Sequence, residues 1–176
     1  MAKAGRRRLV DSAVAVISRD GVAGLTLDAV AAEAGVSKGG LLYHFPTKQA
    51  LLQGVVATVL DDWHESVAGL AAAEPDQAGG AARAYVRACS EDKAGLEANF
   101  ALLAILAIDR DQAETWRQLA STWADEDKDD LDLTLARLAA DGLWLATLFD
   151  LYGVRGDRRS AVVDRILELT QKGAPR

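Results

Sequence analysis

The chain has 176 residues, half of them hydrophobic and three of them proline, which is typical of a folded domain and excludes a disordered chain. The net charge of −6 is unevenly distributed: residues 1–60 carry seven basic and four acidic side chains, whereas residues 61–176 carry 13 basic and 22 acidic ones. Either the N-terminal part alone meets a polyanion, or the acidic surface simply aids solubility.

The sequence predicts a cytoplasmic protein. Cys89 is the only cysteine, so no intramolecular disulfide can form, which fits a reducing compartment. Asp11 and Arg19 interrupt the apolar run that follows the arginines at positions 6–8, which argues against a signal peptide. The apolar stretch 96–108 is too short to span a bilayer.

Apolar residues recur at helical spacing, and no stretch shows the alternation of a strand, so we predict an all-α fold of about nine helices. Thr26, Ser37 and Thr47 are predicted N-caps, and Gly21 and Gly35 are predicted stops. In chain order, the first six helices are expected at about residues 9–21, 27–34, 38–44, 47–70, 81–92 and 100–108. A seventh helix should begin at residues 109–112, and an eighth should cover residues 131–152. The last helix should be capped by Asp157 and end at about residue 171.

Three of these expectations concern the C-terminal part. The stretch 100–108 is apolar nearly all round, so that helix should be buried. The run DEDKDD, residues 125–130, should be a solvated junction between helices. Residues 153–156, which include two glycines, should separate the last two helices.

The short helices 27–34 and 38–44, joined by a three-residue turn, have the spacing of a helix-turn-helix. Gly35 can supply the left-handed turn residue, and Val30, Val36 and Leu41 can form a small core against the first helix. Ser37 would cap the second helix, the one that enters a major groove in such motifs. A helical hairpin in an ordinary bundle, with Tyr43 and Phe45 in its core, is the alternative.

Two glycines open that second helix. At Gly39 and Gly40 the intrahelical hydrogen bonds are not yet made, so glycine costs less there, and the missing side chains would let the backbone approach DNA closely. Lys38 adds a cation, and Tyr43, His44 and Lys48 follow where backbone phosphates would lie. Readout could then depend on Lys38, Thr26, thymine methyl groups and DNA shape.

The segment GLTLDAVAAEAGVSKGGLLYHFPTKQALL, residues 24–52, resembles the N-terminal domain of the TetR/AcrR family of bacterial transcriptional repressors. The resemblance covers about residues 8–56 and implies a DNA-binding domain at 1–50 and a ligand-sensing and dimerisation domain at 51–176. Most members have Tyr at the position of Leu42; here Tyr43 follows one residue later, so Leu42 is expected in the small core or at the groove wall. Positions that match DNA-contacting positions of the family are Thr26, Ser37, Lys38, Gly39, Gly40, Tyr43, His44 and Lys48.

The resemblance also implies a homodimer that binds a palindromic operator, with the last two helices at the interface. Each of these helices carries an apolar stripe, although such a stripe could equally face the chain's own core. The stripe residues are Leu138, Gly142, Leu145, Phe149, Val162, Ile166 and Leu169.

The family further implies a small-molecule effector in the C-terminal domain, with the helix from residue 47 as the link to DNA. The abundance of acids favours a cationic or neutral ligand. The aromatic side chains of this region could line a pocket or simply fill a core. The candidate lining residues are Trp63, Phe100, Leu103, Trp116, Trp123 and Trp144.

We expect no enzyme, no cofactor and no metal site. The chain has two histidines and one cysteine, and it lacks the common catalytic and phosphate-binding motifs. His64, with Asp61 or Glu65, offers too few ligands on one helical turn. The remaining alternative is a helical adaptor or ligand-binding protein that does not bind an operator.

Overall fold

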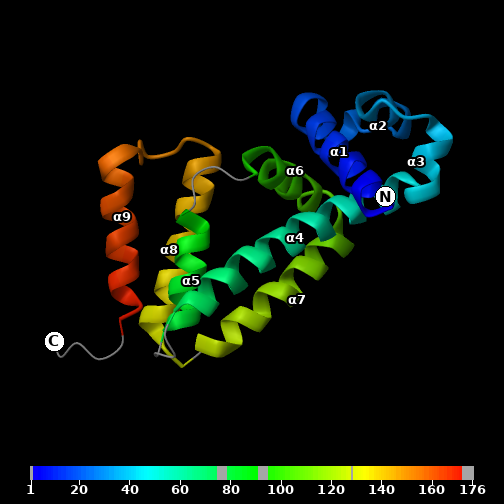
Figure 1. Ribbon diagram of the computed structural model, residues 1–176. Coiled ribbons are helices and arrows are strands. Elements are labelled where there is room, and N and C mark those ends of the chain that lie inside the picture. The colour runs from blue at the N-terminus through cyan, green and yellow to red at the C-terminus, as the bar shows by residue number, and fades with distance from the viewer. Residues whose placement is uncertain (1, 75–78, 91–94, 128, 172–176) are drawn as a thin grey trace. The chain divides into compact units, whose positions relative to one another are not determined.

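The computed structural model describes residues 2–74, 79–90, 95–127 and 129–171, of which 2–4 and 123–127 are described without their side chains. The described residues form helices and no strand, so the predicted all-α fold is confirmed. The nine described helices are α1 (Ala2–Gly24), α2 (Leu27–Ala34), α3 (Lys38–His44), α4 (Lys48–Ala73), α5 (Gly80–Ser90), α6 (Leu96–Leu106), α7 (Arg110–Asp127), α8 (Leu131–Leu148) and α9 (Gly156–Leu169), as labelled in Figure 1.

Contacts between residues divide the chain into two compact units. The first unit comprises residues 1–62 and 95–117, and the second comprises residues 63–94 and 118–176. Helices α4 and α7 each contribute residues to both units. The boundary predicted between residues 50 and 51 separates a DNA-binding domain from a ligand-sensing and dimerisation domain. It divides the chain by function and not by contacts between residues, and it stays a prediction.

In the first unit, α1 packs against α2 and α6, and α2 packs against α3 (Figure 1). The apolar residues of α1 that recur at helical spacing are buried together with those of α2, α3 and α4. Each large apolar side chain that is fully buried stabilises the fold by about 1.5–3 kcal/mol. Members of this core are Leu9, Val10, Ala13, Val16, Ile17, Leu25, Val30, Leu41, Phe45, Leu51 and Val55.

The predicted helix boundaries around the helix-turn-helix are confirmed. Gly21 breaks α1 with a positive φ of 71°, and Gly35 ends α2 with a φ of 63°. The Val36 amide then donates to the Ala31 carbonyl, five residues back, which closes the turn. The Thr47 hydroxyl accepts from the Ala50 amide and starts α4.

Phe45 and Gly54 fix the corner between α3 and α4. The Phe45 side chain is buried, and a Cβ added at Gly54 would lie 2.9 Å from its Cζ atom and closer still to its Cε1 atom. The Arg6 guanidinium lies 4.9 Å from the centre of the same ring, where a cation–π contact is favourable. Only glycine at position 54 leaves room for this ring.

The core of the second unit lies between α5, α8 and α9 (Figure 1). Trp63 and Trp144 pack against this core as half-buried side chains. This packing supports the core-filling interpretation of these two aromatic residues. The buried members of the core are Tyr85, Val86, Cys89, Ala136, Ala140, Leu143 and Ile166.

A polar cluster borders this core. The Tyr85 hydroxyl donates a hydrogen bond to the Asp141 carboxylate, and the Arg137 guanidinium lies 4.9 Å from the centre of the Tyr85 ring. Burial raises the pKa of the Tyr85 phenol and of the Cys89 thiol, because both charged forms would lose their hydration. Burial likewise raises the pKa of Asp141, although Tyr85 and Arg137 both favour its charged form.

A second set of polar contacts joins α5 of the second unit to Glu74 and to the end of α9. Arg83 Nε lies 2.8 Å from Glu74 Oε2, and both side chains are 12% exposed. Arg83 also donates to the Thr170 carbonyl over 3.0 Å, at the end of α9. Arg83 thus satisfies a carbonyl that the end of a helix leaves without an intrahelical partner.

Two predicted helix ends are wrong. Helix α8 ends at Leu148 rather than at residue 152, because Asp150 adopts a positive φ of 53° and the Leu151 amide donates to the Ala146 carbonyl. The predicted Asp157 cap is also wrong. Arg155 is the N-cap of α9, its side chain makes no capping hydrogen bond, and Asp157 lies in the first helical turn.

The expectation that 100–108 is a buried helix is wrong in part. Ala101, Leu102 and Ile105 are buried, but Phe100 is 40% exposed and Ile108 is 66% exposed. One side of α6 packs in the first unit and the other side does not, even though the sequence is apolar all round. The charge run 125–130 lies at the junction between α7 and α8. The backbone of residues 125–127 forms the end of α7, and the Asp130 carboxylate caps α8.

Candidate nucleic-acid interface

The eight residues predicted to contact DNA lie on three consecutive segments of the first unit. Thr26 stands at the start of α2, Lys48 begins α4, and the other six belong to α3 and its cap. All of them are exposed except His44, which is half-buried. The structure therefore places all eight on the helix-turn-helix and the helix that follows it. Their contacts with DNA stay a prediction.

Thr26 and Ser37 are N-caps, as predicted. The Thr26 hydroxyl oxygen accepts from the Ala29 amide over 3.1 Å, and the Ser37 oxygen accepts from the Gly40 amide over 3.1 Å. Such caps are each worth about 1 kcal/mol. Each hydroxyl keeps its own hydrogen, which can still be donated to a phosphate oxygen.

Lys38 has an intramolecular partner at the surface. Its Nζ atom lies 3.0 Å from Asp28 Oδ2, and both side chains are more than half exposed. An exposed ion pair of this kind contributes about 0–1 kcal/mol. Lys38 can therefore exchange Asp28 for a phosphate at little cost.

Lys48 has a structural contact that the sequence did not reveal. Its Nζ atom donates to the Val22 carbonyl over 3.0 Å, in the last turn of α1. A cation at the C-terminal end of a helix is favourable, because the carbonyls there carry partial negative charge. This contact holds the start of α4 against the end of α1.

The exposed surface of α3 and of the turn before it differs from the sequence expectation. Val36 is 36% exposed and Leu42 is 37% exposed, so placing Val36 in the small core is wrong, and Leu42 does not lie in that core either. Tyr43 is 83% exposed, and its ring meets His44 edge-on at 5.1 Å. The alternative with Tyr43 as a core residue is therefore also wrong.

The two glycines of α3 differ in how much space a side chain would have at their positions. A Cβ added at Gly39 would meet no atom within 4 Å. A Cβ at Gly40 would lie 3.4 Å from the Ser37 hydroxyl oxygen and 4.0 Å from the Val36 Cβ, both ordinary contacts. Neither glycine is required by the packing of the described residues.

Arg8 is a basic neighbour of the motif that the site prediction omitted. Its side chain is exposed, and its Nη2 atom lies 3.3 Å from the position of an added Gly35 Cβ. Arg8 thus brings a positive charge to the turn of the helix-turn-helix. The run of arginines at positions 6–8 was the signal in the sequence that could have indicated it.

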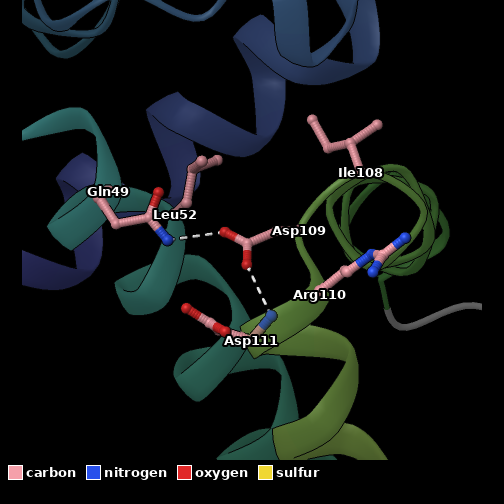
Figure 2. Close-up of a pocket in the computed structure, with 6 residues that line it drawn as sticks. All are labelled: Gln49, Leu52, Ile108, Asp109, Arg110 and Asp111. Atoms are coloured by element: carbon pink, nitrogen blue, oxygen red, sulfur yellow. Dashed lines mark hydrogen bonds between the residues drawn. The ribbon is translucent and has the colours of Figure 1, made fainter.

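The described pocket lies beside the start of α4, within the first unit. It has a volume of about 460 Å³ and is lined by Gln49 and Leu52 of α4 and by residues 108–111 (Figure 2). Gln49 donates to Asp109 over 2.7 Å, and the other Asp109 oxygen accepts from the Asp111 amide. The Gln49 hydrogen bond holds the pKa of Asp109 below its ordinary value, because it stabilises the carboxylate. Asp109 therefore caps α7 and connects it to the first turn of α4.

Comparison with known families identifies both parts of the sequence. Residues 9–55 match the family of bacterial regulatory proteins described as the tetR family. Residues 79–171, more than half of the chain, match the family described as "Tetracyclin repressor-like, C-terminal domain". The chain belongs to the TetR family. The resemblance stated from residues 24–52 is thereby confirmed.

Two regulators with related sequences support this membership. The HTH-type transcriptional regulator TtgW of Pseudomonas putida is 42% identical over 57 residues, which are 32% of this chain and 42% of TtgW. RutR of Escherichia coli K12 is 40% identical over 60 residues, which are 34% of this chain and 28% of RutR. The chain thus spans less than half the length of each of these relatives.

Two solved structures share the fold. A transcriptional regulator from Rhodococcus sp. Rha1 has a TM-score of 0.71 at 20% identity, covering 94% of this chain and 95% of that one. The multidrug binding protein EbrR, in complex with malachite green, has a TM-score of 0.66 at 27% identity, covering 93% and 96%. The fold of this TetR-family chain therefore matches theirs over nearly the whole length.

The predicted effector pocket of the TetR-family chain stays a prediction. Phe100, Leu103 and Trp116 belong to the first unit, whereas Trp63 and Trp144 belong to the second. The side chain of Trp123 lies outside the described residues. None of the other five residues lines the pocket of Figure 2.

The two predicted interface stripes differ in exposure. On α8, Leu138 is 62% exposed, Phe149 is 50% exposed, Leu145 is 37% exposed and Gly142 is exposed. The α9 stripe, in contrast, turns toward the second unit's own core. Ile166 is 5% exposed within that core, and Val162 and Leu169 pack against it. The interface role of these three residues stays a prediction.

The described residues offer neither a membrane span nor a metal cluster. No helix among them combines the length and the hydrophobicity that crossing a bilayer requires. In the same part of the chain, no three His, Cys, Asp or Glu residues are grouped so that they could hold a metal ion.

Proposed function

We propose that this TetR-family chain is a transcriptional repressor that binds a palindromic operator as a homodimer and leaves it when a small molecule binds. The observation that carries the proposal is the helix-turn-helix with its capped and exposed α3. Leu41 and Phe45 are buried beneath α3, while Lys38, Gly39 and Tyr43 are exposed on it. A helix that is anchored in this way can enter a major groove without disturbing the core.

Phosphate contacts would come from residues around this helix. Lys38, Tyr43 and Lys48, with the Ser37 and Thr26 hydroxyls, supply the donors that bind phosphate oxygens. Arg8 adds a charge at the turn. These contacts release counterions from DNA, so binding must weaken steeply as salt rises.

The experiment that tests the proposal measures binding of the purified protein to the promoter DNA of its own gene at several salt concentrations. The logarithm of affinity should fall linearly with the logarithm of salt concentration, and Lys38→Ala should make this slope shallower by about one. Arg117→Ala is the matched control, because it removes an exposed positive charge from α7, and it should leave the slope unchanged. Sequence-independent binding, or no binding, would contradict operator recognition.

The homodimer is supported by the exposed face of α8. Six residues on this face follow spacings of four and three in alternation, which is the repeat of two helices packed at a shallow angle. Five of them are large apolar side chains that are more than a third exposed, and the sixth is a glycine that permits close approach. The residues of this α8 face are Leu131, Leu135, Leu138, Gly142, Leu145 and Phe149.

The small-molecule effector is supported by the structure of EbrR with malachite green, because EbrR shares the fold and 27% of the aligned residues. A panel of compounds should contain at least one that raises the melting temperature of the protein and weakens operator binding. The two effects are linked, since a ligand shifts an equilibrium only by its differential affinity for the two states. If compounds that stabilise the protein all leave operator affinity unchanged, the effector role is contradicted.

A further inference from the structure

The pocket of Figure 2 belongs neither to the predicted DNA contacts nor to the predicted effector pocket. Its volume of about 460 Å³ lies within the range of small-molecule sites, roughly 300–1,000 Å³. None of the eight residues predicted to contact DNA lines it, and neither does any of the five effector-pocket candidates whose side chains are described. All of its lining residues lie in the first unit.

Part of the pocket lining is apolar. Leu52 is buried at 5% exposure, whereas Ile108 is 66% exposed despite its large aliphatic side chain. A ligand that covers Ile108 removes apolar surface from water, which is favourable. The occupant of the pocket should therefore have an apolar body.

The polar part of the lining is centred on the Asp109 carboxylate. It accepts hydrogen bonds from the Gln49 side chain over 2.7 Å, from the Asp111 amide over 3.1 Å and from the Gln112 amide over 3.2 Å. All three donors are neutral, and a carboxylate can accept about four such bonds. The Arg110 guanidinium points away from this carboxylate in Figure 2. The charge of Asp109 is therefore open to a cation from solution.

The neutral donors also keep Asp109 ionised. The Gln49 hydrogen bond and the two amide hydrogen bonds lower the pKa of Asp109, because they stabilise the carboxylate. A hydrogen bond from a cation to a carboxylate is about twice as strong as one between neutral groups. The donor that suits this pocket is therefore an ammonium or an amidinium group rather than a neutral amide.

We propose that the pocket binds a small organic cation, with its ammonium or amidinium group on Asp109 and its apolar body against Leu52 and Ile108. The exposed Asp111 side chain, which also lines the pocket, adds a second negative charge. The inference goes beyond the proposed function, because neither operator binding nor release by an effector requires a ligand at this place. Its test uses no DNA, so the two can fail separately.

The test uses three compounds of nearly equal shape and different charge: benzamidine, benzamide and benzoate. Each is titrated into the full-length protein while NMR follows the Gln49 side-chain amide and the Asp111 backbone amide, because both donate to Asp109. Benzamidine should shift both resonances and bind about tenfold more tightly than benzamide, the factor expected for a charged rather than a neutral donor. Benzoate should leave both resonances unchanged.

Two variants locate the cation and its apolar body. Asp109→Asn should keep the start of α7, because asparagine is as good an N-cap as aspartate, and should reduce benzamidine affinity about tenfold. Ile108→Ser changes an exposed side chain, so the fold should persist even if Asp109→Asn fails to fold. It should weaken benzamidine and benzamide alike by about fourfold, the factor for one buried methylene group.

Asp130→Asn is the matched control, because Asp130 caps α8 in the second unit and does not line the pocket. It should bind benzamidine as tightly as the wild type. The inference is overturned if benzamide binds as tightly as benzamidine, or if benzamidine leaves the Gln49 and Asp111 resonances unchanged. Wild-type affinity in Ile108→Ser together with wild-type affinity in a folded Asp109→Asn protein would also overturn it.

Discussion

At the scale of single residues, α3 begins with glycines that the fold itself does not require. Gly39 and Gly40 occupy the helix without a positive φ, and an added Cβ meets open space or ordinary contacts. Alanine would stabilise a helix by up to about 1 kcal/mol relative to glycine at such positions. Glycine here therefore fits a requirement of binding rather than of folding.

Gly39→Ala should separate these two requirements. Its stability in urea should stay equal or rise by up to about 1 kcal/mol, because alanine favours the helix. Its operator affinity should fall about tenfold, a loss of about 1.4 kcal/mol, because the new methyl group holds the backbone away from the groove. Gly69→Ala on α4, whose added Cβ also meets open space, should show the gain in stability without the loss of affinity. Unchanged affinity in Gly39→Ala would contradict the close approach of α3 to DNA.

At the scale of elements, close contacts between helices set the geometry of each unit. In the first unit the Phe45 ring occupies the space that a side chain at Gly54 would need. In the second unit the Tyr85–Asp141 hydrogen bond joins α5 to α8. A substitution at each contact should change the stability of the protein, whereas a matched substitution at an exposed position should not.

Gly54→Ala should destabilise the first unit. The new Cβ would overlap Phe45 Cε1, and the ring is a buried side chain rather than the free end of a flexible one. Overpacking of this kind costs about 1–3 kcal/mol, more than alanine gains as a helix former. Urea denaturation monitored by circular dichroism measures the loss, with Gly69→Ala as the control. A Gly54→Ala protein as stable as the wild type would show that the α3–α4 corner adapts.

Asp141→Asn should change how stability depends on pH. The raised pKa of Asp141 means that its contribution is fully present below the unfolded-state pKa and is lost as pH rises through the folded-state pKa. The asparagine keeps an oxygen that accepts from Tyr85 and carries no buried charge. Its melting temperature should therefore exceed that of the wild type near pH 7, and the difference should shrink toward pH 4.

For a chain of this size, about 1 kcal/mol corresponds to about 2–4 °C in melting temperature. Asp164→Asn, on the exposed side of α9, is the control and should follow the wild type at each pH. A difference that grows as pH falls would contradict the burial of the Asp141 charge.

At the scale of the whole molecule, the α8 face matters most, because it is the widest exposed run of large apolar side chains on one described helix. Leu131 and Leu138 are 72% and 62% exposed, which is unfavourable in water unless a partner covers them. A second copy of the same face would bury them by two-fold symmetry.

Leu138→Asp should convert the proposed dimer into a monomer. The two aspartates would face each other near the symmetry axis, where both desolvation and like charge oppose association. Analytical ultracentrifugation measures the assembly, and operator affinity should fall at least about tenfold because two half-sites are no longer bound together. Leu96→Asp, on α6 of the first unit, is the matched control. A Leu138→Asp protein that remains a dimer would exclude α8 from the interface.

The sequence by itself determined the helices and the motif, because their signals are local. Thr26, Ser37 and Thr47 cap helices through hydrogen bonds to amides three residues away, and Gly35 supplies a backbone conformation that few other residues adopt. Such interactions depend on a few neighbouring residues, so they can be read without knowing the fold. The missed end of α8 is instructive, because its left-handed residue is Asp150 rather than glycine.

Only the tertiary structure decided which apolar residues are covered. The stripes of α8 and α9 have similar spacing, yet Leu138 is exposed and Ile166 is buried, because Ile166 belongs to the core of the second unit and Leu138 lies outside it. The same holds for Val36, which lies outside the core that contains Leu41. Burial depends on residues distant in sequence, such as the Arg83–Thr170 pair, and no local pattern specifies which distant segment covers a given face.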